Sequence, residues 1–143
     1  MRKLLATLFI LLFIPSQLLA LSWCEYLEKN QIEVVCDELD VSNNGRTDII
    51  VFLTPEDLRP FPFHENPLIS NFIYYSVFAA HYSKERKRDL FVLYVLFDDK
   101  EVAIFIKTKK LRRCLRKKPE KALECLLHKA RYVVHEATPE ASS

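Results

Sequence analysis

The chain has 143 residues, of which 21 are Lys or Arg and 19 are Asp or Glu, so its formal net charge is +2. A chain of this length supports one domain with a single core and leaves no room for a second. It contains one glycine, which excludes a glycine-rich phosphate loop and a nucleophile elbow, because both need at least two. Composition therefore indicates a small globular protein and points to no enzyme class.

The first 22 residues have the layout of a secretory signal peptide. Two basic residues precede an uncharged apolar run at 4–14, and small residues follow at Ala20 and Ser22. The run is shorter than the roughly 20 residues that span a bilayer. We expect cleavage after Ala20 or Ser22 and a secreted or periplasmic protein. An uncleaved membrane anchor is the alternative.

Residues 23–136 are expected to form one α+β domain, followed by a small, polar and disordered tail at 137–143. Capping residues and hydrophobic periodicity predict the order helix, strand, strand, helix, strand, strand, helix, helix. The corresponding ranges are 22–30, 32–36, 49–53, 66–83, 90–97, 101–107, 108–118 and 119–134. We expect a four-stranded antiparallel sheet with helices packed against it.

The segment 89–108 is the centre of the predicted sheet. An unbroken apolar run at 90–97 is rich in β-branched and aromatic residues, and a polar break separates it from an alternating run at 101–107. Two such runs predict a β-hairpin. Because the first run is apolar at every position, we expect that strand to lie centrally, covered on both faces.

Four cysteines, Cys24, Cys36, Cys114 and Cys125, lie after the predicted signal peptide. An even number in a small exported chain favours disulfides. Four cysteines allow three pairings, and we favour the local one, Cys24–Cys36 with Cys114–Cys125. Four reduced thiols remain the alternative if the chain is not exported.

A polar loop precedes the second predicted strand and carries oxygen-bearing side chains at alternate positions. It resembles the calcium loop of EF-hands and, more closely, that of integrin-type propeller repeats, over about 12 residues. The resemblance implies a calcium site, with Arg46 contributing its backbone carbonyl. The implied ligands are Asp40, Ser42, Asn44, Arg46 and Asp48. Ser42 and Asn44 replace carboxylates, and Val51 stands where an EF-hand has a bidentate Glu, so binding would be weak. The alternative is a metal-free turn around Asn44-Gly45.

Charge is divided unevenly along the chain. Residues 23–66 hold 10 acids and 3 bases, whereas 67–143 hold 16 bases and 9 acids. The basic residues concentrate on the predicted helix at 108–118, where Lys109, Arg112, Arg113 and Arg116 share one side. A basic amphipathic helix suits an anionic envelope surface or an acidic protein. Nucleic acid is disfavoured because no aromatic residues interleave with the charges. The alternative is a solvated face that offsets the acidic half of the chain.

Catalytic signals are absent. The four histidines are scattered, and Cys125 stands one helical turn before His128 but is expected to be oxidised. We therefore name no catalytic residue and expect a disulfide-stabilised, non-catalytic binding or accessory protein of the cell envelope. The alternatives are a calcium-stabilised structural module and a small secreted hydrolase or redox protein. The aromatic loop 61–64 is a second candidate contact for a partner.

Overall fold

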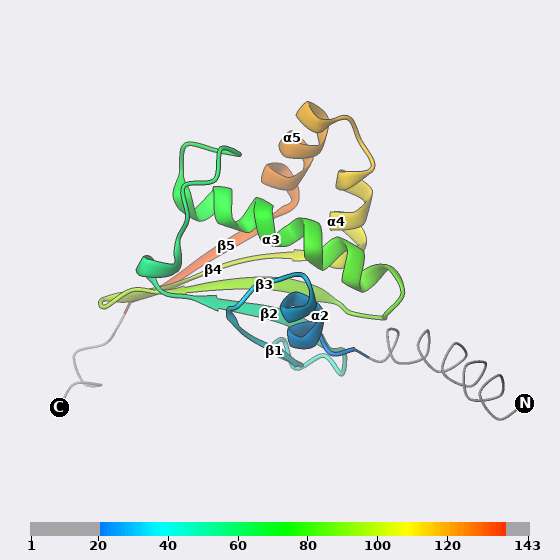
Figure 1. Cartoon of the computed structure of the whole chain (residues 1–143), viewed down its shortest axis with the longest axis horizontal. Helices are drawn as coiled ribbons and strands as arrows, with labels where there is room; N and C mark the ends of the chain where they lie inside the picture. The colour runs from blue at the N-terminus through cyan, green and yellow to red at the C-terminus, as the bar shows by residue number, and fades with distance from the viewer. Residues whose placement is uncertain (1–20, 137–143) are drawn as a thin grey trace, which may run out of the picture.

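The computed structural model describes residues 21–136 (Figure 1). The predicted tail at 137–143, and all of the predicted signal peptide except its last two residues, lie outside the described residues. None of the described helices is long and apolar enough to cross a membrane. The elements are α2 (Trp23–Lys29), β1 (Val35–Leu39), β2 (Asp48–Leu53), the 3-10 turn η1 (Pro55–Asp57), α3 (Pro67–Lys84), β3 (Leu90–Leu96), β4 (Lys100–Lys107), α4 (Thr108–Leu115), α5 (Pro119–Lys129) and β5 (Arg131–Glu136).

The sheet is five-stranded and mixed, in the order β1-β2-β3-β4-β5. β2 and β3 run parallel, and the other three neighbouring pairs are antiparallel. The predicted α+β class holds, but the prediction of a four-stranded antiparallel sheet is wrong in strand number and in direction. The parallel direction follows from α3, which joins β2 to β3. This helix returns the chain to the end of the sheet at which β2 began.

The fifth strand forms where the last helix was predicted to continue. α5 ends at Lys129, and Ala130 already has an extended backbone with φ −68° and ψ 145°. The following Tyr132, Val133 and Val134 are β-branched or aromatic and favour strand. They pair with the outer edge of β4, in a register running from Phe105↔Arg131 to Lys100↔Glu136. Pairing to a neighbouring strand therefore outweighs the 3–4 spacing of these apolar residues.

β1 begins later than predicted. Ile32 was assigned to the strand at 32–36, but its amide donates to the Leu27 carbonyl at 2.9 Å and its side chain is buried. It therefore completes the turn after α2. The segment Asp37–Leu39, predicted as part of a polar loop, instead pairs with β2, from Asp37↔Ile50 to Leu39↔Asp48.

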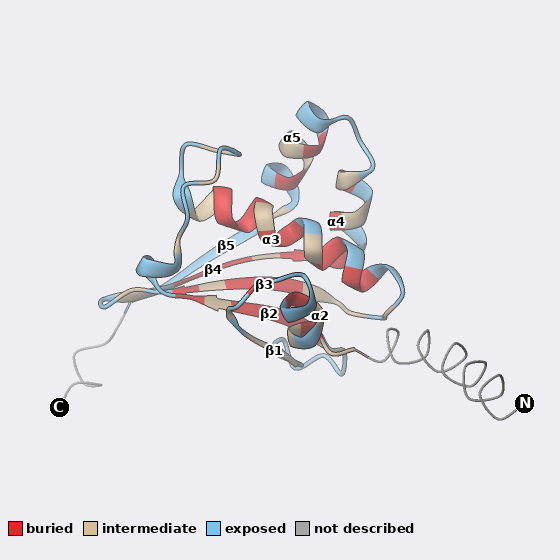
Figure 2. Ribbon diagram, viewed as in Figure 1, coloured by how far each residue is buried: buried red, intermediate tan, exposed pale blue. Residues whose placement is uncertain are grey.

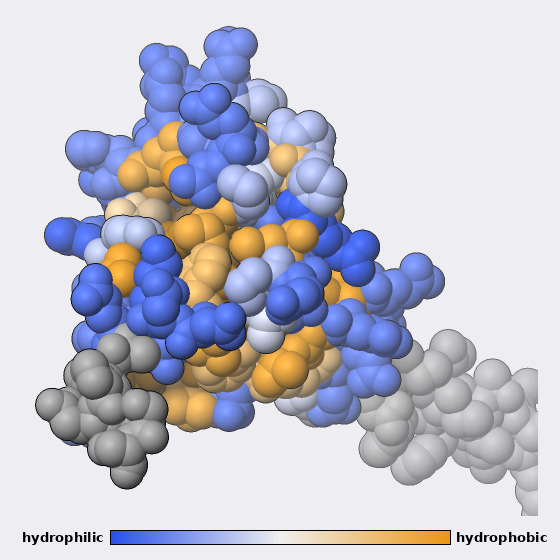
Figure 3. Space-filling view, turned by 90° about the vertical axis from the view of Figure 1, so that its left-hand side faces the viewer, coloured by the Kyte–Doolittle hydropathy of each residue, from blue (hydrophilic) through white to orange (hydrophobic). Residues whose placement is uncertain are grey.

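The main core lies between the sheet and its layer of helices (Figures 1 and 2). Trp23 of α2 is fully buried, packs on Tyr82 of α3 and on Phe91 of β3, and donates from Nε1 to the Ile50 carbonyl at 3.0 Å. β3 is the central strand, as predicted, but the helices cover one face of the sheet, so the expectation that β3 is covered on both faces is wrong (Figure 1). The other face of the sheet carries only a smaller cluster, Ile50, Val92 and Ala103, rimmed by partly exposed aromatic residues. Hydrophobic residues also reach the surface between hydrophilic ones in the view of Figure 3.

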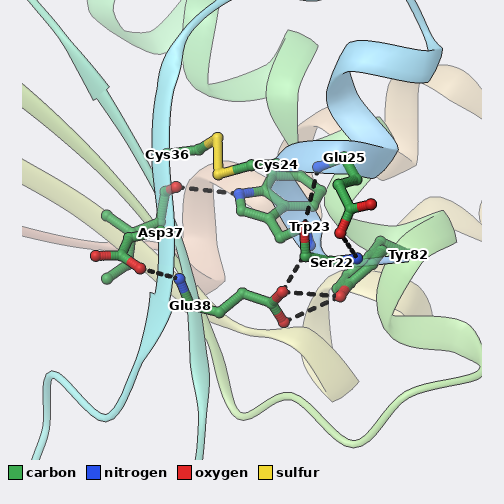
Figure 4. Close-up of a disulfide and its surroundings, with 9 residues drawn as sticks. Ser22, Trp23, Cys24, Glu25, Cys36, Asp37, Glu38 and Tyr82 are labelled. Carbon is green, nitrogen blue, oxygen red and sulfur yellow. Dashed lines mark hydrogen bonds between the residues drawn. A yellow bond between two sulfur atoms is a disulfide. The ribbon is translucent and has the colours of Figure 1, made fainter. Parts of the chain in front are cut away.

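Both favoured disulfides are present. Cys24–Cys36 joins α2 to β1, with Cα atoms 5.7 Å apart (Figure 4). Cys114–Cys125 joins α4 to α5, with Cα atoms 5.4 Å apart. Each closes a short loop, which restricts the unfolded chain and anchors a helix whose own apolar stripe is small.

Candidate anion-binding site

A hollow of about 1050 Å³ opens where three chain segments meet. The segments are the loop between β1 and β2, the loop between α3 and β3, and the junction of β4 with α4. Eight basic residues and two acidic residues line it, and we call it the basic hollow. The basic residues are Arg46, Lys84, Arg86, Lys87, Arg88, Lys107, Lys109 and Arg112, and the acidic residues are Glu85 and Asp89.

Strand direction brings these segments together. β2 and β3 are parallel, so both begin at the same end of the sheet. β4 is antiparallel to β3 and finishes at that end. Backbone hydrogen bonds then join the three segments. The Asp89 amide donates to the Thr47 carbonyl at 2.8 Å, and the Thr108 amide donates to the Asp89 carbonyl at 2.8 Å. The Thr108 hydroxyl also donates to the Arg88 carbonyl. The floor of the hollow is therefore built into the sheet.

The arginines of the hollow are held by the protein itself. Arg88 Nε donates to Glu38 Oε2 at 2.6 Å, and Arg112 donates to the Ser83 hydroxyl at 2.8 Å. Arg86 donates to the Tyr82 carbonyl at 3.2 Å, and its guanidinium lies 4.2 Å from the centre of the Tyr82 ring. These contacts fix the walls of the hollow while keeping the positive charges in place.

Glu38 is the anchor of this network (Figure 4). Its carboxylate accepts from the Trp23 amide at 2.6 Å and from the Tyr82 hydroxyl at 3.0 Å, in addition to Arg88. Burial, the hydrogen bond to Glu38 and the Glu38 charge together raise the pKa of Tyr82 to about 12. Burial by itself would lower the pKa of Arg88, but the hydrogen bond and the charge of Glu38 outweigh burial and raise it. Arg88 therefore stays charged.

The lysines of the hollow differ from its arginines. Lys84, Lys87, Lys107 and Lys109 are all exposed, and none of their side-chain ammonium groups has a hydrogen bond or ion pair within residues 21–136. Four ammonium groups around one concave surface repel one another and attract an anion. The geometry therefore suits a ligand or a partner surface that carries several negative charges.

The predicted basic helix supplies only part of this site. Lys109 and Arg112 line the hollow, whereas Arg113 of α4 and Arg116, the residue that follows α4, are exposed and lie outside its lining. Leu111 of α4 is buried.

The sequence pattern assigned no role to the residues at 84–88, which line the hollow. The predicted hairpin could have indicated their place in it. Pairing 90–97 with 101–107 places the residues just before the first strand beside the end of the second strand. The register Leu90↔Lys107 shows this neighbourhood.

The proposed calcium loop is satisfied by its own amides. Asp40 accepts from the Asn44 amide at 3.1 Å and from the Gly45 amide at 2.7 Å, one bond to each carboxylate oxygen. The Asn44 side-chain oxygen accepts from the Arg46 amide at 2.9 Å. Gly45 has φ 79°, a left-handed conformation that glycine adopts without strain. The contacts are those of a tight polar turn.

Asp48 fits a calcium site poorly. Its side chain is fully buried, one carboxylate oxygen accepts from the Val41 amide at 3.0 Å, and the other accepts from the Leu90 amide at 3.0 Å. Burial raises the pKa of this carboxyl, although the amide hydrogen bonds oppose the shift. Within residues 21–136 no three His, Cys, Asp or Glu side chains are grouped so that they can hold a metal ion. A calcium ion would have to displace these amides, and calcium binding stays a prediction.

The other residues considered as a partner contact or as a catalytic pair are mostly engaged within the protein. Phe61 stacks on Tyr74 with ring centres 4.1 Å apart, while Phe63 is 43% exposed, so only part of the aromatic loop 61–64 is free to touch a partner. Cys125 is in a disulfide and is therefore no nucleophile for His128.

Comparisons of this chain with protein-family models, with curated proteins and with solved structures gave no match.

Proposed function

We propose that this chain is an exported, disulfide-stabilised, non-catalytic binding protein whose basic hollow takes an anionic partner at the cell envelope. The observation that carries the proposal is the set of four unpaired lysines, Lys84, Lys87, Lys107 and Lys109, around one hollow. A charged surface that only keeps a protein soluble needs no such concentration, because interspersed charges of both signs achieve that.

The start of α4 adds to the attraction. Helix N-termini carry a partial positive charge and unsatisfied amides, which favour anions. The N-cap of α4 is Lys107, which provides no side-chain hydrogen bond to the helix. Lys107, Thr108 and Lys109 all line the hollow, so the positive end of α4 and the lysine charges act on the same space.

The two disulfides support the exported part of the proposal, because disulfides persist in oxidising compartments and are rare in the cytosol. The binding part rests on charge and shape. No nucleophile, base and orienting group stand together in the hollow, whose titratable side chains are ammonium and guanidinium groups with Glu85 and Asp89. Such a set binds anions and is poorly suited to general acid–base chemistry near neutral pH.

A paired lysine experiment tests this proposal. Binding of the purified chain to anionic phospholipid vesicles and to poly-glutamate is measured at low and high salt. Each lysine near an anionic surface contributes about 1 kcal/mol, so K87S/K109S should weaken binding by about 30-fold. Binding of the wild type should weaken steeply as salt rises, because salt screens charges over about 8–10 Å.

The matched control is K117S/K121S, which removes two exposed lysines that do not line the hollow. It should bind nearly as well as the wild type. Equal loss in the two double variants would show that total charge, and not the hollow, drives binding. A wild type that binds neither the vesicles nor poly-glutamate at low salt would contradict the proposal. Preference for poly-glutamate over vesicles would identify an acidic protein as the partner.

A further inference from the structure

β5 is an unprotected edge of the sheet. It pairs with β4 on one side only, and all six of its residues are exposed. Tyr132, Val133 and Val134 are 62%, 37% and 40% exposed. Edge strands present unpaired N–H and C=O groups and are usually protected by inward charges, proline, a bulge or a covering segment. The middle of β5 has no charged residue and no proline.

The opposite edge of the sheet is protected. The Glu38 amide on β1 donates to the carboxylate of its neighbour Asp37 at 2.8 Å. Cys36, also on β1, is tied to α2 by a disulfide. Acidic side chains therefore occupy β1, whereas nothing in the described residues occupies the outer edge of β5.

We propose that β5 pairs antiparallel with β5 of a second copy of this chain, joining two five-stranded sheets into one. The charges along β5 favour a second copy of the chain as the partner and an antiparallel direction. The chain is basic before and at the start of β5, with Lys129 and Arg131, and acidic at its end, with Glu136. Antiparallel pairing sets the basic end of each copy beside the acidic end of the other, whereas parallel pairing sets like charges together.

The alternation of side chains limits the register. Residues that face each other across a strand pair lie on the same face of the sheet, so a symmetric antiparallel pair is centred on one residue and its own copy. For a six-residue strand the two central choices are Val133 and Val134. Either choice places uncharged β-branched side chains in the middle of the interface, which suits a β-sheet.

Apolar surface continues beside the strand on the side of the helices. A hollow of about 290 Å³ is lined by Leu68, Ile69 and Phe72 of α3, by Ile104 of β4 and by Tyr132 of β5. Leu127 of α5 also lines it and is 43% exposed. A second copy docked along β5 would cover part of this surface, so the contact is not limited to backbone hydrogen bonds.

Oligomeric state tests the proposal. The purified chain with both disulfides formed should sediment with twice the mass of one chain. This mass should not depend on ligand binding at the basic hollow, which is sensitive to salt. V133K/V134K should halve that mass, because lysine on an edge opposes strand addition. The matched control V35K/L39K places the same charges on β1, where both side chains are exposed, and should keep the dimer mass.

Hydrogen exchange of the wild type gives a second, independent measurement that does not depend on the folding of a variant. Amides at 131–136 should become more protected as protein concentration rises, and those at 35–39 should not. A wild type with the mass of one chain up to millimolar concentration overturns the proposal. So does a dimer that the β1 variant dissociates, or one whose concentration-dependent protection lies outside β5.

Discussion

Glu38 and Arg88 form an ion pair, with 2.6 Å between Oε2 and Nε, although they lie 50 positions apart in the chain. Their side chains are only 16% and 24% exposed. Glu38 belongs to the acidic half of the sequence and Arg88 to the basic half, so the pair joins β1 to the loop that lines the basic hollow. The uneven charge along the chain is partly used inside the molecule.

Removal of the Glu38 charge should therefore destabilise the fold. We expect E38Q to lower the free energy of unfolding by about 2 kcal/mol, because it leaves Arg88 partly buried without its counter-ion and weakens the hydrogen bonds from Tyr82 and the Trp23 amide. Urea unfolding measures the change. E28Q, on the exposed surface of α2, is the control and should stay within about 0.5 kcal/mol of the wild type. Equal stability of the two variants would show that the pair is dispensable.

Alkaline stability should report on Tyr82. Its pKa is raised to about 12 in the folded protein, against about 10 for a tyrosine in the unfolded chain. The stabilisation linked to this shift is fully present below pH 10 and is lost as the pH rises to about 12. The slope is about 1.4 kcal/mol per pH unit for one group. Y82F should show a shallower fall in the free energy of unfolding between pH 10 and 12. The exposed Y132F is the control and should keep the wild-type slope.

Each disulfide should contribute about 3 kcal/mol, because each closes a loop of similar length in the unfolded chain. C24A/C36A and C114A/C125A should both unfold at lower denaturant concentration by that amount. Peptide mapping without reduction should recover Cys24 linked to Cys36 and Cys114 linked to Cys125. Recovery of a Cys36–Cys125 link would contradict the pairing.

The calcium hypothesis makes a thermal prediction. With a Kd of about 0.5 mM, within the range of weak extracellular sites, 5 mM calcium should add roughly 1.4 kcal/mol to stability. The melting temperature should then rise by a few degrees, and D40A should remove the calcium-dependent part of the rise. The comparison is made within each variant, with calcium against chelator, because Asp40 also supports the turn. An unchanged melt of the wild type would leave only the turn.

The mature N-terminus should be Leu21. Ser22 caps α2, since its hydroxyl accepts from the Glu25 amide at 3.1 Å, and the Leu21 carbonyl accepts from the Tyr82 hydroxyl at 3.1 Å. Cleavage after Ala20 keeps both contacts, whereas cleavage after Ser22 removes a cap that contributes about 1 kcal/mol. N-terminal sequencing of the exported protein checks this. A chain that begins at Trp23, or an uncleaved chain that begins at Met1, would contradict it.

Local chemistry determined much of the fold before any contact was known. The capping box at Ser22 and Glu25, the start of α3 at Asn66-Pro67 and the hairpin at 90–107 follow from residues near one another in the chain. The two disulfides follow from cysteine number and short separations. Turn, cap and periodicity rules act over a few residues, and a single sequence contains all that they need.

Tertiary structure decided what depends on distant partners. Arg131–Glu136 became a strand because β4 had a free edge, and the helical spacing of its valines could not reveal that edge. The parallel pairing of β2 with β3 placed Arg46, Lys87 and Lys107 around one hollow, although they are far apart in the sequence. The basic helix supplied only Lys109 and Arg112 to that hollow. Charge patterns along a chain show which residues are basic, but strand order and direction decide which of them share one space.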